Sequence, residues 1–137
     1  MSMRTIRAAE ILVLAAFAAG AGGVHLAAHH SFAPFNLTTE KTLAGTIKQF
    51  DWTNPHTWIW IDVANEKGVV ETWGVEGMSP NYLARRGWSR TTFKPGDKAT
   101  IVVRPMRDGS PGGMFVRATL ANGRELTFAG GPVEAPR

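Results

Sequence analysis

The sequence predicts a mainly β fold, a small bent barrel of five to six antiparallel strands, OB-like, with one short helix. Three observations lead to this prediction. Segments rich in β-branched and aromatic residues recur between turn sequences, and a single segment carries helix signals. The chain has 137 residues, which leaves room for one small domain. A half-open meander sheet or a sandwich is the alternative fold.

The expected strands lie at residues 42–52, 57–63, 69–76, 98–106 and, as a closing hairpin, at 114–128. The second stretch, TWIWIDV, has the strongest β pattern, and the turn NEKG joins it to the third. The closing hairpin turns at Asn122-Gly123. A helix is expected over 79–87, because Ser79 is a favourable N-cap, Pro80 suits the first helical position and Gly87 suits the end.

The N-terminus has the pattern of a secretory signal peptide over residues 1–28. Arg4 and Arg7 precede the apolar stretch ILVLAAFAAGAGG, and small residues follow. Cleavage would deliver a periplasmic or secreted bacterial protein, whereas an uncleaved segment would anchor it to the membrane. Residues 29–128 then form a single β-barrel-like domain, and the Gly- and Pro-containing residues 129–137 form a flexible tail.

Composition excludes several classes of function. The chain has no cysteine, so it has neither disulfides nor thiolate metal sites, and core burial must hold the domain together. The net charge of +4 is spread along the chain, which argues against a nucleic-acid partner. The sequence has no nucleophile elbow and no phosphate-binding glycine loop. We therefore expect a binding protein rather than an enzyme.

Three histidines are the candidate metal ligands. His29 and His30 begin the expected mature chain, and His56 follows Pro55 in the stiff corner WTNPH. Three imidazoles without a thiolate fit copper, with zinc as the alternative. The alternative for the doublet is a solvated linker, and the alternative for His56 is a hydrogen bond within its own turn.

Methionines offer a second kind of donor. Met78, Met106 and Met114 could supply thioether ligands to Cu(I), although methionines in strands more often fill gaps in a core.

Alternation along the second strand separates two faces. One face carries aliphatic side chains, and the other carries polar and indole side chains: Ile59, Ile61 and Val63 against His56, Trp58, Trp60 and Asp62. If the aliphatic face lines the barrel, the indoles lie outside and need a cover or a ligand. Phe32 and Phe35 are then the expected cover, and they would carry His29 and His30 towards His56. In the other arrangement the tryptophans fill the barrel and the isoleucines pack under the helix.

Two clusters are candidates for ligand or partner binding. The first is the indole face of Trp58 and Trp60, with Asn54 and Asp62 at its rim, which suits a periplasmic or membrane protein, an apolar ligand or an oligosaccharide. The second is ARRGWSR, where Arg86 and Trp88 could anchor a partner. In the alternative, Trp88 closes the helix end against the core.

Four motifs together resemble a known family. The motifs AHHSFAPF, WTNPHTWIWIDV, SPNYLARRGW and FKPGDKATIVVRPMRDGS occur here in the order of an uncharacterised bacterial family of small exported proteins, a domain of unknown function (6152). The matching positions are His29, His30, Ser31, Phe32, Trp52, Asn54, Pro55, His56, Gly87 and Trp88. The resemblance implies an exported single-domain β protein and no established activity.

Overall fold

The computed structural model describes residues 32–128. Its elements in chain order are β1 (Lys41–Asp51), β2 (Trp58–Ala64), β3 (Val70–Glu76), α2 (Pro80–Ala84), β4 (Lys98–Pro105), β5 (Gly112–Leu120) and β6 (Glu125–Thr127). The expected signal peptide, His29, His30 and the expected tail lie outside the described residues. The strands start and end within a few residues of their predicted bounds.

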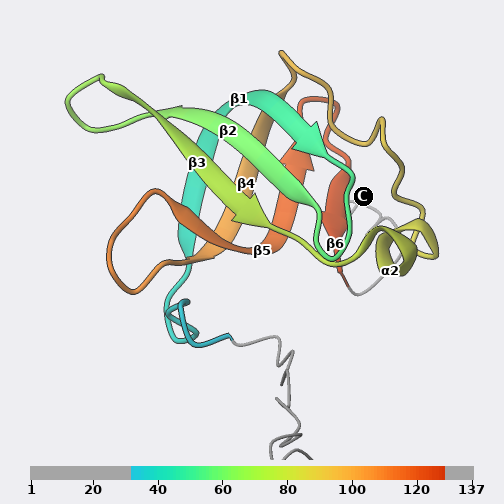
Figure 1. Cartoon of the computed structure of the whole chain (residues 1–137). Coiled ribbons are helices and arrows are strands. Elements are labelled where there is room, and N and C mark those ends of the chain that lie inside the picture. Colours follow the sequence, from blue (N-terminus) through green and yellow to red (C-terminus); the bar gives the residue numbers. More distant parts are fainter. Residues whose placement is uncertain (1–31, 129–137) are drawn as a thin grey trace, which may run out of the picture. The chain divides into compact units, whose positions relative to one another are not determined.

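The six strands form one sheet in the order β3-β2-β1-β4-β5-β6, which closes on itself (Figure 1). Closure comes from β3 and the start of β5, where Gly74–Glu76 pair in parallel with Gly112–Met114. The far end of β5 pairs with β6 instead. The predicted OB-like barrel with one short helix is therefore confirmed, and its closing pair is parallel while the other pairs are antiparallel.

The long strand β1 bends so that it serves two neighbours. Its first half pairs with β4 and its second half with β2, and the register shifts between Ile47 and Gln49. Gly45 sits where β2 comes closest, since a Cβ atom there would lie 2.2 Å from the carbonyl oxygen of Asp62. The glycine thus permits a backbone approach that any side chain would block.

The barrel interior is filled by aliphatic side chains and by rings at its margins. Ile59 and Ile61 of β2 are 1% and 0% exposed. The other members of this core are Leu43, Ile47, Trp73, Val75, Leu83, Trp88, Phe93, Ala99, Ile101, Val103, Phe115, Ala118 and Leu126. Of the two arrangements predicted for β2, the structure shows the one in which the isoleucines face inwards.

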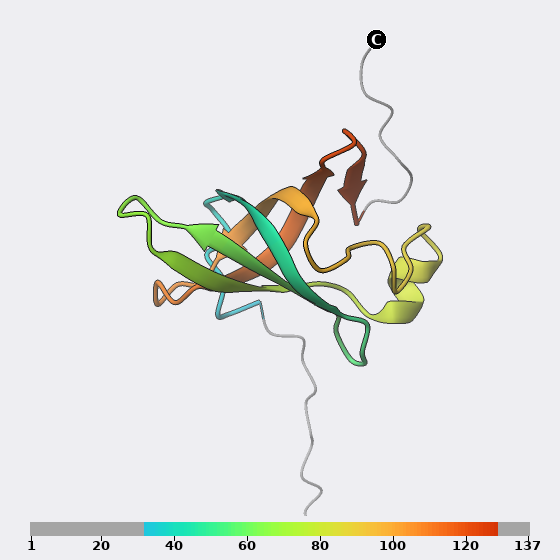
Figure 2. The ribbon, with the colours of Figure 1, turned by 90° about the horizontal axis from the view of Figure 1, so that it is seen from above.

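Helix α2 is short and lies at the opposite end of the barrel from the β2–β3 turn (Figure 2). The Ser79 hydroxyl caps it by accepting a hydrogen bond from the backbone N–H of Tyr82, and Pro80 occupies the first turn, as predicted. Leu83 is fully buried against the core. Gly87 follows with a φ of 82°, so the chain can turn away at a position that favours glycine.

Candidate functional site

The corner before β2 is held by backbone and hydroxyl groups. The Asn54–Pro55 peptide bond is cis. The Thr53 hydroxyl donates to the His56 carbonyl at 3.2 Å, and the buried Thr57 donates from both its backbone N–H and its hydroxyl to the Met78 carbonyl, at 3.1 and 3.0 Å. Asn54, which the sequence placed at the rim of a binding face, is exposed. Within this turn it is the Thr53 side chain that forms the hydrogen bond expected of a turn residue.

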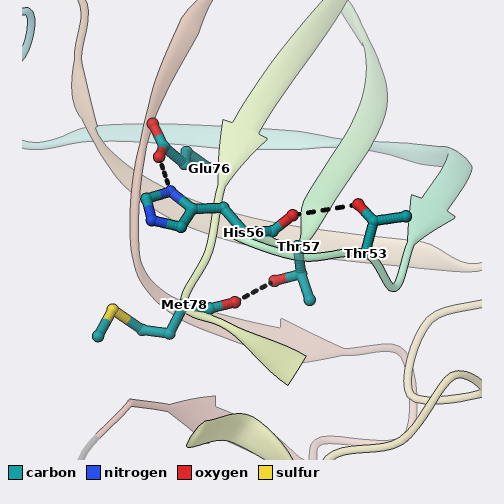
Figure 3. A network of polar contacts seen from close by, with 5 residues as sticks. All are labelled: Thr53, His56, Thr57, Glu76 and Met78. Atoms are coloured by element: carbon teal, nitrogen blue, oxygen red, sulfur yellow. Dashed lines mark hydrogen bonds and ion pairs between the residues drawn. The ribbon is translucent and has the colours of Figure 1, made fainter. Parts of the chain in front are cut away.

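His56 projects from this corner towards β3, where its Nδ1 atom pairs with the Glu76 carboxylate (Figure 3). Both side chains are 21% exposed. An ionised carboxylate can only accept, so in this pair Nδ1 carries the proton and Glu76 fixes the orientation of the ring. Glu76, on the neighbouring strand, is therefore a partner of His56, and the prediction that His56 bonds only within its own turn is wrong.

Trp58 and Trp60 lie on the outer face of β2, as alternation from the buried isoleucines requires. Their rings are 5.9 Å apart with planes inclined by 19°. Across to β3, Trp58 pairs with Glu76 and Trp60 pairs with Gly74. A Cβ atom at Gly74 would lie 2.9 Å from Trp60 Cζ3, so the glycine makes room for the indole.

Polar side chains surround the two indoles. The Trp60 Nε1–H donates to Asp51 Oδ2 at 2.7 Å, and the Thr72 hydroxyl donates to Asp62 Oδ1 at 2.6 Å. Lys48 Nζ donates to the Thr72 hydroxyl at 3.1 Å. A hollow of about 420 Å³ opens beside Trp60 and is lined by Lys48, Gln49, Asp51, Trp60 and Thr72. Asp62 thus lies on the indole face, as the strand pattern predicted.

The expected aromatic cover over the indoles does not form from the phenylalanines. Phe35 is buried, but it forms an isolated bridge with Met106, while Phe32 remains 54% exposed. Among residues 32–128, the ring contact recorded for Trp58 and Trp60 is the one between them. The physical reason is register: Phe35 pairs beyond the end of β4, whereas the two indoles stand on β2.

The second predicted cluster does not form a surface platform. Trp88 is 4% exposed and packs edge-on against Phe93 and Phe115. Arg86 folds back over the Tyr82 ring, with its guanidinium carbon 3.6 Å from the ring centroid, and its Nη1 donates to the Tyr82 carbonyl. The alternative in which Trp88 closes the helix end is the one that the structure shows.

The predicted metal ligands fall into two parts. His29 and His30 lie outside the described residues, so the structure describes one member of the set, His56. Within residues 32–128, no three His, Cys, Asp or Glu side chains gather into a group that could hold a metal ion. The described part of the chain also contains no helix with the length and apolarity to cross a membrane.

Sequence reasoning missed Glu76 as the partner of His56. The signal was present, because counting outwards from the NEKG turn places Trp58 opposite Glu76 and leaves His56 just beyond the end of the ladder. That count needs the exact hairpin register, which the structure supplies.

Comparison with curated proteins and with solved structures returns no match. A family model does match, and it spans residues 17–117, from within the expected signal segment to the middle of β5. The match covers the whole corner, both hairpin strands β2 and β3, and the helix. The chain therefore belongs to the family of unknown function DUF6152.

Proposed function

We propose that this chain is a small exported binding protein without catalytic activity, and that it holds a copper ion through His29, His30 and His56. The observation that supports this most strongly is the pairing of His56 Nδ1 with Glu76. A histidine that ligates a metal usually donates its other ring N–H to a carboxylate, which fixes the tautomer and the direction of the coordinating nitrogen. His56 would then coordinate through Nε2.

The position of the doublet in the sequence also supports its role. His29 would begin the expected mature chain, and its new N-terminal amine would add a nitrogen donor suited to copper.

Titration of the purified exported protein with Cu(II) and with Zn(II), by calorimetry, tests this proposal. We expect one copper ion per chain, and His56→Ala should weaken binding more than about tenfold, because one of three imidazole ligands is removed. Glu76→Gln should weaken it by about 10- to 100-fold, since the ring loses its orienting carboxylate. Glu66→Gln is the matched control, because Glu66 is an exposed carboxylate in the β2–β3 turn.

Unchanged affinity in His56→Ala would remove this histidine from the site and leave its pair with Glu76 a purely structural contact. Stoichiometric binding of zinc but not copper would correct the metal. An intact mass of the exported protein locates the cleavage point and detects a metal that remains bound.

A structural or adaptor protein is the second candidate. It is favoured by the parallel Trp58 and Trp60 rings on the outer face, which are half-buried and flanked by the hollow beside Trp60. Indoles are frequent anchors of protein interfaces. A periplasmic or membrane partner recovered equally well with all metal chelated, and lost in Trp58→Ala, would favour this function over the metal site.

A further inference from the structure

The hollow beside Trp60 on the outer face of the barrel takes no part in the proposed copper site. It opens where β1, β2 and β3 run side by side, and its lining residues are Lys48, Gln49, Asp51, Trp60 and Thr72. We propose that this hollow binds one unit of a neutral saccharide, with the sugar ring against the Trp60 indole and its hydroxyl groups on the polar side chains. None of the five lining residues is a proposed copper ligand, so saccharide binding is independent of the metal.

The strand register places the hollow on one side of Trp60. Thr72 pairs with Asp62, the next outward residue along β2, and Lys48 lies at the register shift of β1, one residue before the partner of Trp60. Trp58 is the outward residue on the other side of Trp60, and the two rings are inclined by only 19°. Trp58 therefore supports the Trp60 ring from one side, while the other side lines the hollow.

The polar side chains around the hollow are held in place by one another. Asp51 accepts from the Gln49 amide through Oδ1 and from the Trp60 Nε1–H through Oδ2, so its carboxylate fixes both neighbours. Lys48 Nζ donates to the Thr72 hydroxyl at 3.1 Å, and that hydroxyl donates in turn to a carboxylate of β2. Side chains that are already ordered lose less conformational entropy when a ligand binds.

These bonds leave hydrogen-bonding capacity of both kinds around the hollow. A carboxylate has about four acceptor positions, and two of those on Asp51 are used by Gln49 and Trp60. The Lys48 ammonium has three N–H groups, and the Gln49 carbonyl oxygen is a further acceptor. A hydroxyl group both donates and accepts, so adjacent sugar hydroxyls can meet the acceptors of Asp51 and Gln49 and the donors of Lys48.

The charges and the polarity of the lining favour a neutral, polar ligand. Lys48 is the cation and Asp51 the anion among the five lining residues, and Asp62 lies 3.9 Å from Lys48. The two carboxylates would repel a phosphate or carboxylate group, and Lys48 would repel a cation. Four of the five lining residues are polar, which disfavours a purely apolar ligand. The Trp60 indole suits the C–H face of a pyranose ring.

The size and position of the hollow also suit a saccharide. Its volume of about 420 Å³ lies within the range of small-ligand sites, about 300–1,000 Å³. Strands 2 and 3 of OB-type barrels form the face that binds oligosaccharides or oligonucleotides in other proteins, and the carboxylates here disfavour a phosphate backbone. Because one sugar unit makes few contacts, we expect a dissociation constant of about 1 mM.

The test is an NMR titration of the ¹⁵N-labelled, purified exported protein, with all metal chelated, against three neutral probes: cellotriose, xylotriose and the trimer of N-acetylglucosamine. At least one should bind and shift the signals of the Trp60 indole N–H and the Gln49 side-chain amide. The indole signals of the buried Trp73 and Trp88 should stay in place. Trimers of galacturonic acid and of glucosamine, which are anionic and cationic, should bind about fivefold more weakly or less.

Substitutions locate the site. Trp60→Ala should weaken binding by more than about tenfold, because it removes the aromatic surface. Lys48→Ala and Gln49→Ala should each weaken it by about three- to tenfold through the loss of hydrogen bonds. Lys48 and Gln49 are exposed, so these two variants test the site even if Trp60→Ala disturbs the fold. Far-UV circular dichroism checks that each variant folds.

Lys98→Ala is the matched control for Lys48→Ala. Lys98 Nζ also donates to a threonine hydroxyl, that of Thr46, and Lys98 also lines a hollow of about 420 Å³. That second hollow is lined mainly by alanine, threonine and leucine residues in place of an indole. Lys98→Ala should therefore bind the saccharide as the wild type does.

Binding of a neutral trimer that is weakened in Trp60→Ala, Lys48→Ala and Gln49→Ala but kept in Lys98→Ala supports the saccharide site. If no neutral trimer shifts the Trp60 signal at about 10 mM, the site is refuted. Wild-type affinity in both Lys48→Ala and Gln49→Ala refutes it too, and so does tighter binding of the anionic or cationic trimer. His56→Ala should bind the saccharide normally, so failure of the saccharide site leaves the proposed copper site unaffected.

Discussion

The two faces of β2 carry different kinds of residue and different kinds of contact. On the inner face Ile59 and Ile61 are almost completely buried and touch the apolar core. On the outer face Trp58 and Trp60 touch each other, a glycine and a carboxylate. One strand therefore separates the residues that stabilise the fold from the residues that can meet a ligand. Substitutions on the two faces should be separable by experiment.

The largest effect on stability is expected on the inner face. Ile61→Ala should lower the free energy of unfolding by about 2–5 kcal/mol, because it opens a cavity in a closed barrel that has little room to relax. Urea unfolding followed by circular dichroism measures this loss. Val70→Ala is the control, since Val70 is 63% exposed and should change stability by less than about 0.5 kcal/mol. Similar losses in both variants would contradict the division into two faces.

Two glycines, Gly74 and Gly113, lie where β3 and β5 pair to close the barrel, and they allow a second comparison. In Gly113→Ala the new methyl group would lie 2.8 Å from the Arg104 carbonyl oxygen and 2.9 Å from Val103 Cβ, and that backbone cannot yield easily. We expect a loss of about 1–3 kcal/mol from overpacking. In Gly74→Ala the obstacle is the Trp60 ring, which can tilt outwards.

The Gly74→Ala variant should therefore lose less stability than Gly113→Ala and should change the tryptophan fluorescence spectrum more. Unfolding midpoints and emission spectra of the two variants decide this point. The reverse order of stability would show that Trp60 is as firmly fixed as the backbone at Gly113.

A smaller effect is expected at the indole nitrogen. Trp60→Phe removes the hydrogen bond to Asp51 while keeping a ring over Gly74, so the free energy of unfolding should fall by about 1–2 kcal/mol. Trp58→Phe is the matched control, because the contact recorded for Trp58 is the ring contact with Trp60. Chemical denaturation compares them, and an equal loss in the two variants would show that the Asp51 hydrogen bond contributes nothing.

The smallest effect belongs to the rim of the outer face. Lys48 and Asp62 form an ion pair at 3.9 Å, with side chains 57% and 34% exposed. Lys48→Gln should change stability by no more than about 0.5 kcal/mol, because water and salt screen such pairs. Repeating the measurement in about 1 M NaCl should remove the difference. A loss that persists at high salt would mean that Lys48 stabilises the fold through packing instead.

Much of the fold could be predicted because its signals are local. Period-two alternation in TWIWIDV, the turn residues around it and the Ser79-Pro80 start of the helix each involve a few neighbouring residues. The parallel closing pair of β3 with β5 could not be predicted, because it joins residues about 38 positions apart in the chain and depends on barrel geometry. The same limit applied to Phe35, because its bridge partner, Met106, is distant from it in the sequence.

The candidate site was predicted in part. His56 and the two indoles were singled out from sequence, which left open whether the indoles face outwards; the carboxylate that orients His56 was not identified, and Trp88 proved to be a core residue. The residues next to a tryptophan in the sequence do not show whether its side chain will be exposed or buried. It is decided by which aromatic rings meet it, here those of Phe93 and Phe115.

The sequence by itself determined that this chain is a small β protein without disulfides, with one capped helix and a histidine in a proline corner. These properties follow from composition and from backbone preferences of adjacent residues. The tertiary structure decided that β2 turns its isoleucines inwards, that Glu76 meets His56 and that β5 closes the barrel against β3. These outcomes depend on register and closure, because a shift of one residue in either strand would exchange the two faces.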